Sequence, residues 1–216
     1  MAFKGRATSA GGTGTREVPE AGTHPAVLVA MIDLGTHEED FDGKQKSQRK
    51  VFLCWELVNE RMSGSTMNFV LGKEYTLSYH AKGALRQTAE KLRKKPYQDG
   101  EEIDYSRMLG FPCLLTVEVK QSASSPDKSY ARVKDVTALP KGMQCPRPQW
   151  EPFAWAIEDG GDAPDFDWLP RVFGERIADK VSRSPEWEGR EDADDAGEDA
   201  DAFEEVPVPA GDDTPF

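Results

Sequence analysis

Residues 69–95, FVLGKEYTLSYHAKGALRQTAEKLRKK, decide the fold class because the spacing of the apolar side chains changes inside this stretch. From Phe69 to Tyr79 apolar and polar residues alternate, which predicts a β-strand with one face toward a core. From Ala81 to Lys95 the apolar residues recur at spacings of three and four among good helix formers, which predicts a helix that Pro96 ends. A strand followed directly by a helix therefore stands near the middle of the chain.

Four further segments predict strands around this pair, because each is rich in β-branched and aromatic residues. They are residues 26–34, 51–58, 111–120 and 129–139. The polar stretch 36–50 between the first two predicts a long loop. The resulting order of three strands, a helix and two strands is that of the OB-fold, a small and partly open Greek-key barrel. Other α+β layouts share this element order. We expect a mostly β chain with a five-stranded OB-fold barrel over residues 23–140.

The formal net charge of -12 is unevenly distributed along the 216 residues. Residues 1–150 carry 22 basic and 18 acidic side chains, whereas residues 151–216 carry 5 basic and 21 acidic ones. An acidic surface repels phosphates, but here the repulsion is confined to one end and the body is mildly basic. The charge therefore leaves nucleic acid open as a partner of the body and predicts an interaction tail.

Composition divides the remainder of the chain into appendages. Residues 1–22 are rich in Gly, Thr, Ala and Ser, which predicts a flexible N-terminal arm. Residues 141–188 predict a Pro- and aromatic-containing extension with a short amphipathic helix near 169–182, which packs its apolar stripe onto the barrel or onto a second copy. Residues 189–216 are too acidic and too poor in apolar residues to build a core, so we expect a disordered tail.

Catalysis, metal binding and membrane insertion find little support in the sequence. The three histidines are isolated, and no nucleophile motif, CxxC or Cys/His cluster occurs. The acidic clusters within 38–42 and 162–167 are interpreted as solvated charge rather than as a nuclease metal site. No run approaches the ~20 apolar residues that span a bilayer, and three widely separated cysteines favour a reducing compartment. We expect no enzymatic activity, no cofactor, no metal, no membrane partner and a cytoplasmic location.

The last six residues, Gly211-Asp212-Asp213-Thr214-Pro215-Phe216, are the most specific signal in the chain. They resemble the tip of the acidic tail of bacterial single-stranded-DNA-binding proteins. In that family an OB-fold binds the DNA and the tip docks on replication, recombination and repair proteins. The resemblance implies partner-docking roles for Asp212, Asp213, Pro215 and Phe216, with the Phe216 ring in an apolar pocket and the carboxylates on a basic rim.

The body resembles a phage-encoded kind of single-stranded-DNA-binding protein. Four segments carry this likeness: AGTHP at 21–25, IDLGT at 32–36, KVFLCWEL at 50–57 and SPEW at 184–187. The resemblance implies single-stranded DNA as ligand and the cytoplasm of a host cell as location. The oligomeric state, including a homo-oligomer, stays open.

Binding of single strands needs cations along a groove and aromatic rings on which bases stack. The predicted loop 36–50 supplies four cations, the second and third strands supply aromatic rings, and the last strand alternates aromatic and basic residues. The candidate DNA-binding residues are Lys44, Lys46, Arg49, Lys50, Trp55, Lys73, Tyr75, Tyr79, Tyr130, Arg132 and Lys134.

Each candidate has an alternative interpretation. An aromatic residue in a strand belongs more often to the core, and Trp55 shares its face with Leu53 and Leu57. The basic face of the predicted helix is most simply solvated. Two rival functions also remain: an OB-fold adaptor that binds only protein, and an inhibitor whose acidic tail mimics DNA.

Overall fold

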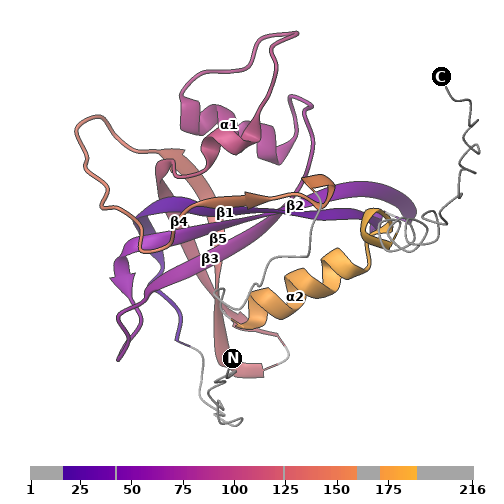
Figure 1. The fold of residues 1–216 in the computed structure, drawn as a ribbon. Coiled ribbons are helices and arrows are strands. Elements are labelled where there is room, and N and C mark those ends of the chain that lie inside the picture. The colour runs from indigo at the N-terminus through magenta and orange to yellow at the C-terminus, as the bar shows by residue number, and fades with distance from the viewer. Residues whose placement is uncertain (1–16, 42, 124, 160–170, 189–216) are drawn as a thin grey trace, which may run out of the picture.

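The computed structural model describes residues 17–41, 43–123, 125–159 and 171–188. This part of the chain is mostly β, as the sequence predicts. Its elements are β1 (Gly22–Phe41), β2 (Lys44–Arg61), β3 (Asn68–Thr76), α1 (Ala84–Arg93), the 3-10 helix η1 (Tyr105–Met108), β4 (Pro112–Ser122), β5 (Ser125–Ala138), β6 (Phe153–Trp155), the 3-10 helix η2 (Ile157–Asp159) and α2 (Arg171–Ser182). The predicted order of three strands, a helix and two strands is confirmed (Figure 1).

The strands form one sheet in the order β3-β2-β1-β4-β5, and β6 adds to β1 in parallel. The other pairings are antiparallel. In the described residues the sheet does not close, because β3 and β5 end the path without a ladder of hydrogen bonds between them. These two end strands still contact each other, and α1 packs against both of them. We call this junction of β3, β5 and α1 the seam.

The prediction of a long loop at residues 36–50 is wrong. β1 and β2 stay paired out to Phe41 and Lys44, and Gly43 in the turn has a φ of +74° that favours glycine. The Asp-Gly pair at 42–43 is a hairpin signal that could have revealed this turn. Since β3 pairs with β2 only as far as Lys50, the outer ends of β1 and β2 form a two-stranded arm beyond the sheet.

One hydrophobic core lies between the sheet, α1 and η1. Alternate residues of all five long strands point into it, and α1 contributes Leu85, Ala89 and Leu92 from its buried face. Trp55 is fully buried there and meets Tyr75 edge-on, with ring centroids 6.4 Å apart. Because aromatic rings bury large areas, these two stabilise the core.

A second hydrophobic core covers the opposite face of β1, β2 and β3. It is closed by residues 145–159 and 171–188, which we call the C-terminal layer, and Figure 1 shows α2 lying over the sheet. Ile177 and Val181 of α2 and Ile157 of η2 are buried against Phe52 and Val29. Both faces of the central strands are therefore covered, which explains why residues 50–58 are buried without alternation.

No helix among the described residues is long and apolar enough to cross a membrane.

Candidate nucleic-acid interface

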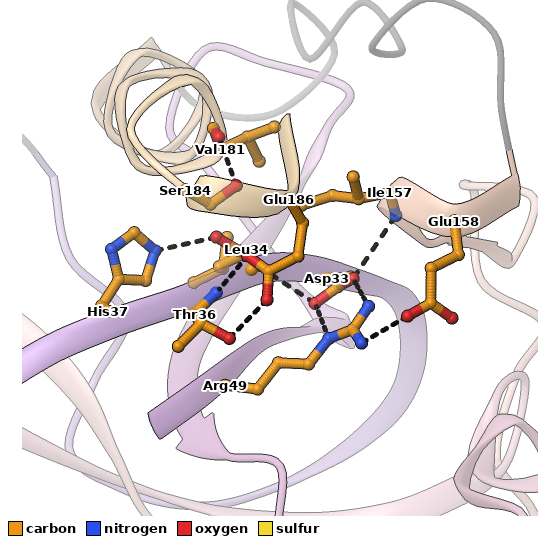
Figure 2. A network of polar contacts seen from close by, with 11 residues as sticks. Asp33, Leu34, Thr36, His37, Arg49, Ile157, Glu158, Val181, Ser184 and Glu186 are labelled. Atoms are coloured by element: carbon orange, nitrogen blue, oxygen red, sulfur yellow. Dashed lines mark hydrogen bonds and ion pairs between the residues drawn. The ribbon is translucent and has the colours of Figure 1, made fainter. Parts of the chain in front are cut away.

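The C-terminal layer is fixed to β1 and β2 by a polar network (Figure 2). Arg49 donates from Nε and Nη2 to the two carboxylate oxygens of Asp33, at 3.2 and 2.5 Å, and from Nη1 to Glu158 of η2 at 2.6 Å. The Ile157 amide donates to Asp33 as well. Hydrogen bonding to Asp33 opposes the effect of burial and raises the pKa of Arg49. All three guanidinium nitrogens of the half-buried Arg49 are thus engaged by Asp33 and Glu158, and its predicted contact with DNA is not supported.

Two of the sequence segments quoted for the family resemblance meet in the same network. Glu186 accepts hydrogen bonds from the Thr36 amide and the Thr36 hydroxyl, as Figure 2 shows. Partial burial opposes ionisation of Glu186, but the bonds from Thr36 outweigh it and lower the pKa. Gly35, at a φ of +73°, lies so close to Ser184 that a Cβ there would sit 2.2 Å from the Ser184 Cβ. IDLGT and SPEW therefore form one packed junction.

Two further carboxylates fix the layer at other points. Glu56 is fully buried and accepts hydrogen bonds from the amides of Gln149 and Trp150. Glu74 on β3 pairs with Arg176 and Lys180 of α2. Buried polar groups of this kind are costly unless they are hydrogen-bonded, so these contacts specify where the layer sits. The face of β2 and β3 opposite the first core is therefore occupied by the chain itself.

Three of the predicted binding residues are buried. Trp55 and Tyr75 are 0% and 4% exposed, so neither ring is available to stack on a base. Lys50 is 6% exposed, and its ammonium donates to Glu39, Thr76 and Gln48. The interpretation of these aromatic rings as core residues is the one that the structure supports.

Other predicted residues gather on the exposed face of β4 and β5 and at the seam. Tyr130, Arg132 and Lys134 are all exposed on β5, and the half-buried Lys73 of β3 lies close enough to Arg132 for their charges to interact. Two cations from other elements join them, Lys91 of α1 and Lys120 of β4. We call the whole group the seam cluster, which consists of the cations Lys73, Lys91, Lys120, Arg132 and Lys134 and the carboxylates Glu118 and Asp135.

The charged side chains of the seam cluster form a patch in which neighbouring charges act on one another. Burial lowers the pKa of Lys73, and the charges of Lys91 and Arg132 lower it further, whereas Asp135 acts in the opposite direction. A hydrogen bond from Arg132 lowers the pKa of Glu118. With five cations against two carboxylates, the patch is a favourable place for an anion.

Tyr130 is the aromatic residue of this patch. It is 46% exposed and pairs across the ladder with Lys120. An exposed ring next to cations combines the stacking platform and the phosphate contacts that single-strand binding needs. Tyr75, by contrast, is buried, and the Lys73 ammonium lies 5.0 Å from the centre of the Tyr75 ring.

The remaining candidates lie elsewhere. Lys44 and Lys46 are exposed on the two-stranded arm. Because β4 pairs with the opposite end of β1, these two lysines are separated from the β4–β5 face by the length of β1. Tyr79 is 55% exposed and stacks on Tyr105, with ring centroids 5.3 Å apart. It borders a hollow of about 460 Å³ that is also lined by Arg86 and by three carboxylates, Asp99, Glu101 and Glu102, so the net charge around it is negative and suits phosphate less well.

Lys91, Lys120 and the two carboxylates of the seam cluster are missing from the sequence-based candidates. Lys91 belongs to the basic face of the predicted helix, but no sequence pattern tells which lysine of that face packs toward β5. The docking residues Asp212, Asp213, Pro215 and Phe216 lie outside the described residues, as do positions 162–167 of the second acidic cluster. The described residues contain no group of three or more His, Cys, Asp or Glu side chains that could hold a metal ion.

Comparison of the chain with protein-family models, with curated proteins and with solved structures finds no match.

Proposed function

We propose that this chain is a sequence-independent single-stranded-DNA-binding protein without catalytic activity. It coats DNA exposed during replication, recombination or repair, and it is phage-encoded, as the resemblance of the body suggests. The observation that carries the proposal is the exposed Tyr130, which lies opposite Lys120 in the β4–β5 ladder, on the strand that also carries the exposed Arg132 and Lys134. Stacking contributes about 1–3 kcal/mol per base and works with every base, which accounts for binding without sequence preference.

The strand order supports the same proposal. β3-β2-β1-β4-β5 with α1 between β3 and β4 is the connectivity of an OB-fold that is open between its third and fifth strands. We infer that the sheet is an OB-fold whose usual ligand face is closed by the C-terminal layer. The single strand then runs over the β4–β5 face and the seam.

Partner recruitment is assigned to the tip of the acidic tail. The Phe216 ring and its α-carboxylate, together with Asp212 and Asp213, offer an apolar anchor inside a negative charge distribution. The net charge of -16 in residues 151–216 keeps this end from binding DNA itself, since like charges repel.

Fluorescence anisotropy of labelled oligo-dT with the full-length protein tests the proposal. We expect binding to the single strand and much weaker binding to a duplex of the same length. Affinity should fall steeply with salt, with a log–log slope of about -0.7 for each phosphate contacted. Equal affinity for duplex and single strand, or no binding at low salt, would contradict the proposal and favour the adaptor or the DNA mimic.

A further inference from the structure

The two carboxylates of the seam cluster lie among the cations that a DNA strand would meet. The Lys91 Nζ and Asp135 Oδ1 atoms are 2.5 Å apart, and the side chains are 49% and 45% exposed. Glu118 accepts hydrogen bonds from Arg132, whose Nη2 and Nε atoms lie 2.5 and 2.6 Å from the carboxylate. The Lys120 ammonium lies 3.9 Å from the same carboxylate. Each carboxylate therefore occupies hydrogen-bonding positions that an incoming anion would also use.

Both carboxylates project from the same face of the sheet. Glu118 lies opposite Arg132 in the β4–β5 ladder, and Asp135 lies opposite Thr116, two residues before Glu118 on β4. They are neighbours on one surface, and the cations around them come from β3, α1, β4 and β5. No single strand or helix carries all of these side chains. The arrangement therefore depends on the packing of α1 against β3 and β5 at the seam.

Ion pairs this exposed contribute little to the free energy of unfolding, typically about 0–1 kcal/mol. The Arg132 Nε and Nη2 atoms both contact Glu118 Oε2, and a phosphate can accept hydrogen bonds from the same two nitrogens. Exchange of a carboxylate for a phosphate on these cations therefore costs little free energy. The cations are already oriented before the DNA binds.

We infer that Asp135 and Glu118 are internal counter-ions that hold the seam cluster in place without DNA, and that backbone phosphates of a bound single strand replace them on Lys91 and Arg132. The inference rests on the proposed function. Because the displaced carboxylates stay beside the phosphates, they repel them and hold the affinity for DNA below its maximum. Removing either carboxylate should therefore strengthen binding, whereas removing a cation should weaken it.

The test compares Asp135→Asn and Glu118→Gln with Glu74→Gln in the full-length protein. Glu74 is a matched control, since it also pairs with two cations but lies under α2 on the opposite face of β3. All three variants change the net charge equally. At low salt we expect Asp135→Asn and Glu118→Gln to tighten binding of labelled oligo-dT about threefold or more, and Glu74→Gln to change it less than about 1.5-fold. The difference should shrink at high salt.

Four outcomes would overturn the inference. Equal tightening by all three variants would show that only net charge matters. Weaker binding by Asp135→Asn and Glu118→Gln would show that the carboxylates position the cations rather than compete with phosphate. If the wild-type protein does not bind oligo-dT, the proposed function fails together with the inference, whereas wild-type binding with unchanged variants removes the inference alone. Thermal unfolding of each variant checks that it is folded. Asp135→Asn and Glu118→Gln test the inference independently, because each removes a different carboxylate.

Discussion

Replacement of Gly35 by alanine should destabilise the protein by forcing the C-terminal layer off β1. The backbone at Gly35 has a φ of +73°, and a non-glycine residue in this left-handed region costs about 1–2 kcal/mol. The new Cβ would lie 2.2 Å from the Ser184 Cβ, and such overpacking typically costs about 1–3 kcal/mol more. We therefore expect Gly35→Ala to lower the free energy of unfolding by about 2–5 kcal/mol.

The two contributions can be separated with Ser184→Gly, which removes the atoms that the alanine would strike. This single variant also loses the hydrogen bond from the Ser184 hydroxyl to the Val181 carbonyl, so it has a cost of its own. In the double variant the clash with Ser184 disappears, and the backbone strain at position 35 remains together with a 3.0 Å approach to the Glu186 carboxylate. A double-mutant cycle should therefore give a coupling energy of about 1–3 kcal/mol.

Urea unfolding followed by tryptophan fluorescence measures these values, because Trp55, Trp150 and Trp187 lie in or against the two cores. Additive effects of the two substitutions would refute the close contact between positions 35 and 184. A Gly35→Ala protein as stable as the wild type would refute both the strained backbone and the packed layer.

Three further predictions concern single side chains. Tyr130→Leu should weaken oligo-dT binding about 5- to 100-fold without changing the urea midpoint, since it removes an exposed stacking ring; unchanged affinity would separate Tyr130 from the DNA. Burial raises the pKa of the Cys113 thiol to about 12 and that of Cys54 as well, so iodoacetamide at pH 8 should modify the half-buried Cys145 first, and peptide mapping checks this order. Burial raises the pKa of Tyr105 to about 12, so its contribution to stability is complete below pH 10 and is lost as the pH rises toward 12. Tyr105→Phe should show a shallower loss in urea unfolding over that range, and an identical pH profile would contradict the assignment.

The fold was largely predictable because the apolar spacing is unambiguous where it matters. The alternation at 69–79 and the three-and-four spacing at 81–95 correctly predict β3 and α1. The arm of β1 and β2 was missed because its outer residues are polar on both faces, so no alternation marks them as strand. Pairing there depends on the turn at Gly43, which is a local signal.

The candidate site was predictable only in part, for a reason of packing. Alternation on β5 identifies Tyr130 and Arg132 as neighbours on one face, and the structure places them so. The shared face of Trp55, Leu53 and Leu57 already favoured a core position for Trp55, but alternation could not reveal that the opposite face of β2 is buried as well. That double burial results from the C-terminal layer, whose contacts join residues more than a hundred positions apart, such as Thr36 and Glu186.

The central claim is that single-stranded DNA runs over the β4–β5 face and the seam, not over the face that the C-terminal layer covers. Photo-crosslinking of a halogenated oligo-dT to the full-length protein, followed by peptide mapping, tests it most directly. We predict crosslinks on Tyr130 and the adjoining residues of β5, and their loss in Tyr130→Leu. Crosslinks concentrated in residues 145–159 or 171–188, or the absence of any crosslink under conditions where a known single-strand binder reacts, would contradict it.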